Sequence, residues 1–119
     1  MSFAAQYQSM AKDVFVHLVQ DDLARGTPAE AQARRYSERG KPDFVLAYLL
    51  SSDLSDDEKR ELLAESYERR AVLTRERADE FSQKFHRDFP FLLTEASHDH
   101  QMAEQIRAGK NITYQERRQ

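Results

Sequence analysis

The chain has 119 residues and a formal net charge of −3 at pH 7, with 33% charged and 39% hydrophobic residues. This length predicts one domain with a modest core, and seven Phe and five Tyr residues argue against a disordered chain. The absence of Cys excludes disulfides and thiolate metal sites, and the negative net charge argues against nucleic acid or anionic lipid as a partner.

Two features predict the compartment. The longest apolar run, from Phe44 to Leu50, is far too short to span a bilayer. The first residues show neither a basic region nor an apolar stretch typical of a secretory signal. We therefore expect a cytoplasmic protein without a membrane partner.

The first predicted element is one amphipathic helix from about Ser2 to Arg25. Its apolar residues recur at spacings of three and four, which is the period of one helix face. One row comprises Phe3, Tyr7, Ala11, Val14 and Leu18, and a second row beside it comprises Phe15, Val19 and Leu23. We expect these rows to form one wide apolar face and Gly26 to end the helix.

A short, largely exposed helix is expected next, ending near Arg39. Thr27 is predicted to cap its start, with Pro28 at the first helical position and Glu30 completing a capping box. The helix should end there because Gly40 and Pro42, on either side of Lys41, break it.

The segment from Phe44 to Leu50 is the most hydrophobic part of the chain. Periodicity alone leaves a buried strand or a buried helix open. We favour a helix, because Leu and Ala dominate, Pro42 and Asp43 form a helix start, and no convincing second strand is available for pairing.

The dominant predicted element is one long helix from about 55 to 88. Ser55 and Glu58 form a capping box, no Gly or Pro interrupts the segment, and Pro90 closes it. Such a helix would be about 50 Å long, whereas a compact domain of this size is roughly 35 Å across. The helix should therefore overhang its own domain, and its apolar side should need a partner.

Apolar and small residues repeat along this helix at spacings of four and three, which is typical of a helix–helix seam. A patch of phenylalanines continues the seam past the end of the helix. We predict a protein interface formed by Tyr67, Ala71, Thr74, Ala78, Phe81, Phe85, Phe89 and Phe91. The alternative for the phenylalanine patch is plain intramolecular core.

A last short helix is expected from about Thr94 or Ser97 to Ala108, with Gly109 as its stop. The domain should thus comprise residues 1–109, followed by a flexible C-terminal tail, 110–119. The predicted fold class is all-α, an irregular bundle of four to five helices, since the elements differ too much in length for a symmetric bundle.

The basic residues offer one alternative function, a regulator associated with nucleic acid. They cluster at Arg34, Arg35, Arg39 and Lys41, then at Arg69, Arg70, Arg75 and Arg77, and finally at Arg117 and Arg118. Acidic residues are interspersed along the long helix, so a charge-mixed solvated surface is the favoured interpretation.

A second alternative is a metal- or small-molecule-sensing domain. His98 and His100 lie near Glu104, and residues four apart share one helix face, as metal ligands often do. An isolated His-x-His pattern is a weak signal, and a polar loop and helix start, capped by Asp99 or Ser97, is the favoured interpretation of this segment. We therefore predict no metal and no cofactor.

The sequence contains no recognisable catalytic constellation. Glycine-rich phosphate loops and nucleophile motifs are absent, and neither His17 nor His86 has a nucleophile and an orienting acid at a motif spacing. The leading expectation is a non-enzymatic adaptor, assembly factor or regulator that acts through protein–protein contacts of the long helix as a homodimer or on a larger partner.

Overall fold

The structure is a computed structural model that describes residues 1–110. Helices account for all its regular elements within that range: α1 (Phe3–Tyr7), the 3-10 turn η1 (Gln8–Met10), α2 (Asp13–Ala24), α3 (Ala29–Glu38), α4 (Pro42–Leu49), α5 (Asp56–Phe85) and α6 (Pro90–Arg107). This confirms the predicted all-α class with one long helix. The predicted tail lies outside the described residues, apart from Lys110.

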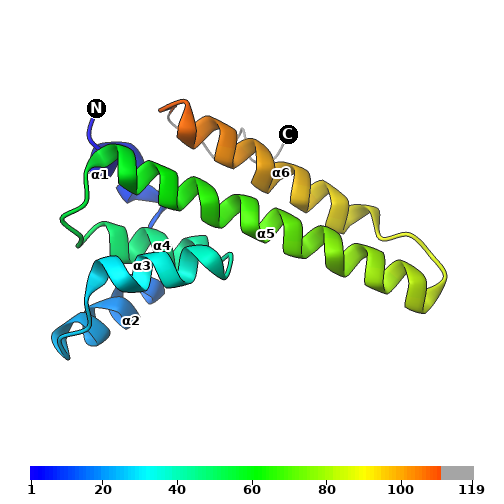
Figure 1. The fold of residues 1–119 in the computed structure, drawn as a ribbon, viewed down its shortest axis with the longest axis horizontal. Coiled ribbons are helices and arrows are strands. Elements are labelled where there is room, and N and C mark those ends of the chain that lie inside the picture. Colours follow the sequence, from blue (N-terminus) through cyan, green and yellow to red (C-terminus); the bar gives the residue numbers. More distant parts are fainter. Residues whose placement is uncertain (111–119) are drawn as a thin grey trace.

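The helices form two groups, which Figure 1 shows. α5 and α6 pack along each other as a long hairpin, while α2, α3 and α4 form a layer against the first half of α5. The molecule measures 47 × 30 × 22 Å, and α5 alone is about 45 Å long at 1.5 Å per residue. The far half of the hairpin therefore extends beyond the α2–α4 layer.

The core lies where the two groups meet. It joins the wholly apolar face of α4 to the first half of α5 and the last turns of α6, with α1 covering one end. Tyr7, Leu49, Leu63 and Ile106 are fully buried there. As predicted, α4 is the most buried element, because apolar side chains occupy nearly its whole circumference.

The predicted helix from Ser2 to Arg25 is wrong as one element. The chain becomes extended at Ala11 and Lys12, which separates α1 and η1 from α2. This break rotates α2 relative to α1, so Phe3 and Tyr7 no longer share a face with Val14 and Leu18. Val19 is buried, whereas Val14 and Leu18 point outward.

The start of α3 also differs from the prediction. Pro28 occupies the N-cap position and provides no side-chain hydrogen bond. The Thr27 hydroxyl instead donates to the Asp22 carboxylate at 3.1 Å. Because Pro28 and not Thr27 holds the N-cap position, Thr27 lies outside the helix and the predicted capping box does not form.

The start of α5 follows the predicted signal, whereas its end at Phe85 comes before the predicted end near residue 88. Ser55 Oγ accepts a hydrogen bond from the Glu58 backbone N–H at 3.2 Å, which caps the start. The helix is continuous to Phe85. α6 begins at Pro90, earlier than the predicted start at Thr94 or Ser97, because Pro90 takes the first helical position, where proline is favoured.

Asp22 connects the ends of three helices. Its carboxylate accepts hydrogen bonds from Tyr48 (2.5 Å), Gln32 (3.3 Å) and Thr27 (3.1 Å). The bonds from Tyr48 and Gln32 lower the pKa of Asp22 below its usual value of 3.8. Burial, together with the bond to Asp22, raises the pKa of Tyr48 to about 12.

These shifts predict the pH dependence of stability. The Asp22 contribution is fully present above pH ~4 and is lost as the pH falls through the lowered pKa. The Tyr48 contribution is present below its ordinary pKa of 10.0 and is lost as the pH rises toward about 12. Asp22→Asn should lower stability at neutral pH and flatten its loss below pH ~4, which urea titrations at several pH values would measure. If the stability of the variant fell below pH ~4 as steeply as that of wild type, Asp22 would not be the group responsible.

Candidate interaction surface

The turn between α5 and α6 is set by two residues. His86 adopts the left-handed conformation, with φ 54°, and so ends α5. Pro90 then starts α6 with its ring in place of a backbone N–H that would have no partner there. The chain reverses between them, and this tight reversal brings residues from both helices to the far end of the hairpin.

Four phenylalanines meet at that end, and we call them the tip cluster: Phe81, Phe85, Phe89 and Phe91. Ring centroids are 5.9 Å apart for Phe81–Phe85, 5.6 Å for Phe81–Phe89 and 6.3 Å for Phe89–Phe91. All these pairs meet edge to face, which is a preferred aromatic geometry. The rings thus hold one another in place across the turn.

The tip cluster is only partly covered. Phe85 is 54% exposed and Phe91 is 62% exposed, and Leu93 beside them is exposed as well. Phe81 and Phe89 are half-buried beneath them. The outer rings therefore contribute little to the core of this chain, and they present aromatic surface to solvent.

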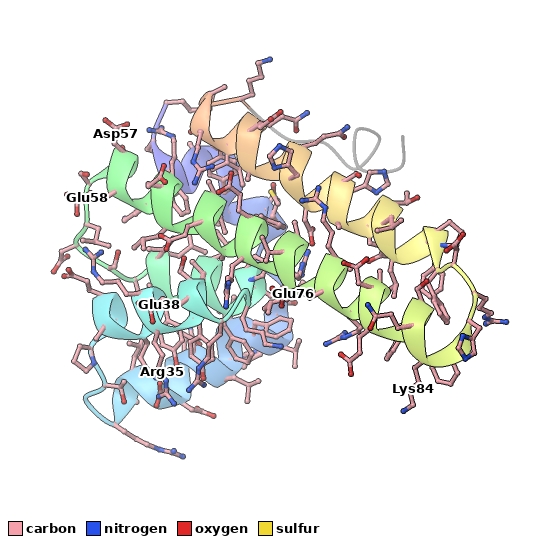
Figure 2. The ribbon with its side chains drawn as sticks, turned by 45° about the vertical axis from the view of Figure 1, so that its right-hand side comes forward. Arg35, Glu38, Asp57, Glu58, Glu76 and Lys84 are labelled. Atoms are coloured by element: carbon pink, nitrogen blue, oxygen red, sulfur yellow. The ribbon has the colours of Figure 1, made fainter. Side chains whose placement is uncertain are left out.

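Cationic side chains border the tip cluster. Lys84 Nζ lies 5.6 Å from the Phe85 ring centroid, and the Arg87 guanidinium carbon lies 5.1 Å from that of Phe89. Both distances suit cation–π contacts. Figure 2 shows Lys84 at the far end of α5, away from the α2–α4 layer. An apolar centre with a charged border resembles the anatomy of a protein interface.

Two sets of ion pairs tie α5 to α6. Arg70 binds Asp99 through two hydrogen bonds of 2.8 Å, a bidentate pair in the middle of the hairpin. Burial lowers the pKa of Arg70, but the bonds to Asp99 outweigh it and the net pKa is raised. Nearer the base, Arg107 binds Glu61 at 2.9 Å and also contacts Glu68. The hairpin therefore presents its tip as one unit.

The predicted interface residues divide into two sets. Tyr67, Ala71 and Ala78 are buried within this chain, where α6 is the main packing partner of α5. Thr74 is half-buried between the two sets. Among the predicted interface residues, only those of the tip cluster retain much exposed surface. α6 therefore covers much of the apolar side of α5, which we had expected another molecule to cover.

The basic residues do not form one unpaired stripe. Arg70 is bound to Asp99, Arg34 is 3.2 Å from Glu30, and Arg69 donates to the Glu38 carbonyl. Arg117 and Arg118 lie outside the described residues. Neighbouring acids thus neutralise part of the charge that a phosphate-binding surface would use.

The histidine segment lies within α6. His100 Nε2 is 3.0 Å from Glu104, as their four-residue spacing allows. Within residues 1–110 no three His, Cys, Asp or Glu residues come together as a possible metal site. These side chains therefore form a local ion pair on the helix surface when His100 is protonated.

A second exposed apolar surface was not anticipated. Val14 and Leu18 on α2 are 60% and 53% exposed. Their four-residue spacing is visible in the sequence, but the same spacing predicts burial. The orientation of Val14 and Leu18 follows from the break at Ala11 and Lys12, because the break lets α2 turn relative to α1. No Gly or Pro in the sequence marks this break.

Comparisons with known protein families, with curated proteins and with solved structures gave no match. Among the described residues, no helix is both long and apolar enough to cross a membrane.

Proposed function

We propose that this protein is a non-catalytic adaptor, assembly factor or regulator that binds other protein surfaces through the tip of the α5–α6 hairpin. The observation that supports this proposal is the tip cluster, where Phe85 and Phe91 are more than half exposed. Large aromatic residues gathered at a projecting end are enriched at binding surfaces, because they bring apolar area at a low entropic cost.

The energetics favour binding by this surface. Covering the exposed half of one Phe removes roughly 100 Å² from water, which is worth about 2.5 kcal/mol. The tip has little to lose on binding, since the ring contacts already order it. A preorganised hairpin avoids much of the entropy loss that a mobile segment would suffer.

The test is a double substitution at the tip, Phe85→Ser with Phe91→Ser. Both side chains are more than half exposed, but the substitutions remove the ring contacts of the tip cluster, so the free energy of unfolding should fall by about 2–4 kcal/mol. A typical domain, with ~5–15 kcal/mol, stays folded after such a loss. We expect the variant to lose the partners, including further copies of the chain, that chemical crosslinking and affinity capture from the native host detect with wild type.

Val72→Ser serves as the matched control, because Val72 is an exposed apolar residue on α5 that lies outside the tip cluster. This control should retain the wild-type partners. Equal capture of all partners by the tip variant and by wild type would show that the tip is not the binding surface.

A further inference from the structure

The second exposed apolar surface lies on one face of α2. Val14 and Leu18 are one turn apart, and Asp21 follows within the next turn on the same face. All three side chains are exposed. We call this set the α2 face.

Each surface has charged groups beside its apolar side chains: Asp21 on the α2 face, and Lys84 and Arg87 at the tip cluster, where the acidic Asp88 follows Arg87 in the same turn. α2 contains three Asp residues and no Lys or Arg, and only Asp22 has its carboxylate engaged in the network with Tyr48. Asp21 makes no ion pair within residues 1–110 and lies near the helix C-terminus, where the helix dipole disfavours a negative charge. The tip cluster is bordered by Lys84 and Arg87. A cation from another molecule would therefore stabilise Asp21.

The two surfaces lie in different parts of an elongated molecule. Figure 1 shows α2 on the far side of the α2–α4 layer from α5, while the turn after α5 projects past the end of that layer. The tip therefore lies too far away to cover the α2 face of its own chain. A second copy, turned by 180° and placed below the projecting hairpin in this view, would bring its α2 toward the tip of the first.

We infer that a second copy of this chain covers both surfaces, so that the tip cluster of each copy packs on Val14, Leu18 and Asp21 of the other in a twofold-symmetric dimer. The inference rests on the proposed function and names the partner. One rotation creates the tip–α2 contact twice, as a closed symmetric dimer requires.

The area decides between this arrangement and a tip-to-tip dimer. Each half-exposed side chain offers roughly 100 Å² or less of apolar surface. Two reciprocal contacts, each joining Phe85, Phe91 and Leu93 to Val14 and Leu18, then bury about 1,000 Å² of apolar surface. With the usual polar share this corresponds to roughly 1,600 Å², the size of a standard stable interface. Tip-to-tip contact reaches only about 600 Å² of apolar surface, which falls in the weak class.

The experiment compares two variants, separately and mixed. The first is the tip variant, Phe85→Ser with Phe91→Ser, and the second is the α2 variant, Val14→Ser with Leu18→Ser. Sedimentation and light scattering on the full chain should give a dimer for wild type, and a dimer dissociation constant at least tenfold higher for each variant. Circular dichroism should show unchanged helix content, because all four side chains are exposed.

Mixing the two variants provides the decisive result. In a mixed dimer, one contact joins an intact tip to an intact α2 face, while the other contact carries both sets of substitutions. Association should therefore recover in the mixture relative to either variant alone. Asp21→Lys offers an independent variant on α2 and should weaken the wild-type dimer as well.

Two results would overturn the inference, and each can be told apart from a failure of the proposed function. If only the tip variant weakens the dimer, the hairpin tip binds protein but α2 is not its target. If wild type is monomeric at every concentration, no second copy is the partner, and host capture with the tip variant still decides the proposed function. Recovery in the mixture, by contrast, requires that the tip of one copy contacts α2 of another. A wild-type species that stops at the dimer then shows that this contact is reciprocal, since a one-way contact would continue into longer assemblies.

Discussion

Gly40→Ala should lower the free energy of unfolding by about 2–5 kcal/mol. Gly40 has φ +67°, which costs an L-residue about 1–2 kcal/mol. An added Cβ would also lie 2.9 Å from the backbone N of Arg70, and overpacking against backbone that cannot move aside costs typically ~1–3 kcal/mol. Urea unfolding followed by circular dichroism would measure the change, which is a large share of the ~5–15 kcal/mol of a typical domain.

Gly26→Ala is the matched control. Gly26 also has a positive φ, of 91°, but nothing lies within 4 Å of an added Cβ. We expect only the conformational cost of about 1–2 kcal/mol. Equal losses at the two positions would mean that the turn between α3 and α4 does not pack on the backbone of α5 as closely as the structure shows.

Arg70→Ala should destabilise the protein by about 2–4 kcal/mol. The substitution leaves the carboxylate of Asp99 buried without its bidentate partner, and an isolated buried charge is far more costly than an exposed one. Arg70 is partly exposed, so water can offset some of this cost. Thermal and urea unfolding of the variant would measure the loss.

The double variant Arg70→Met with Asp99→Leu tests the reason for that loss. Replacing a whole buried pair with apolar side chains is often neutral, so the double variant should be more stable than Arg70→Ala. A double-mutant cycle between the two positions would give their coupling energy directly. A double variant as unstable as Arg70→Ala would show that packing at Arg70, and not the stranded charge, dominates.

These two contacts also support the proposed surface. Gly40 lets the α2–α4 layer lie directly on α5, and Arg70 joins α5 to α6 at the adjoining position. The layer and the hairpin are therefore held together near one point of α5. Loosening either contact should move the tip cluster relative to the α2 face and so weaken reciprocal binding.

Local signals were sufficient to predict α3, α4, α5 and the all-α class. Ser55 caps α5 because its hydroxyl can meet a backbone N–H that has no helical partner. Pro90 marks the start of α6 because proline suits the first helical position, whereas α5 ends earlier, at the left-handed His86.

The tip cluster could be located in the sequence, but its exposure could not be decided. Phe81 and Phe85 are four residues apart and share a face of α5, whereas Phe89 joins them only through the turn that leads into α6. The length of α6 and the turn at His86 decide which residues α6 covers. Tyr67 and Ala78 lie beneath α6, whereas Phe85 and Phe91 remain exposed. The early start of α6 gave α5 a partner from its own chain.

The sequence by itself determined the helical class, the long helix and its start, because these follow from backbone capping, helix propensity and the period of apolar residues. Only the tertiary structure decided which apolar rows are buried. The row of Phe3, Tyr7, Val14 and Leu18 reads as one continuous face, yet the extended backbone at Ala11 and Lys12 turns its second half to solvent. The physical reason is that burial depends on the rotation of one helix relative to another, and the packing of the whole core sets that rotation.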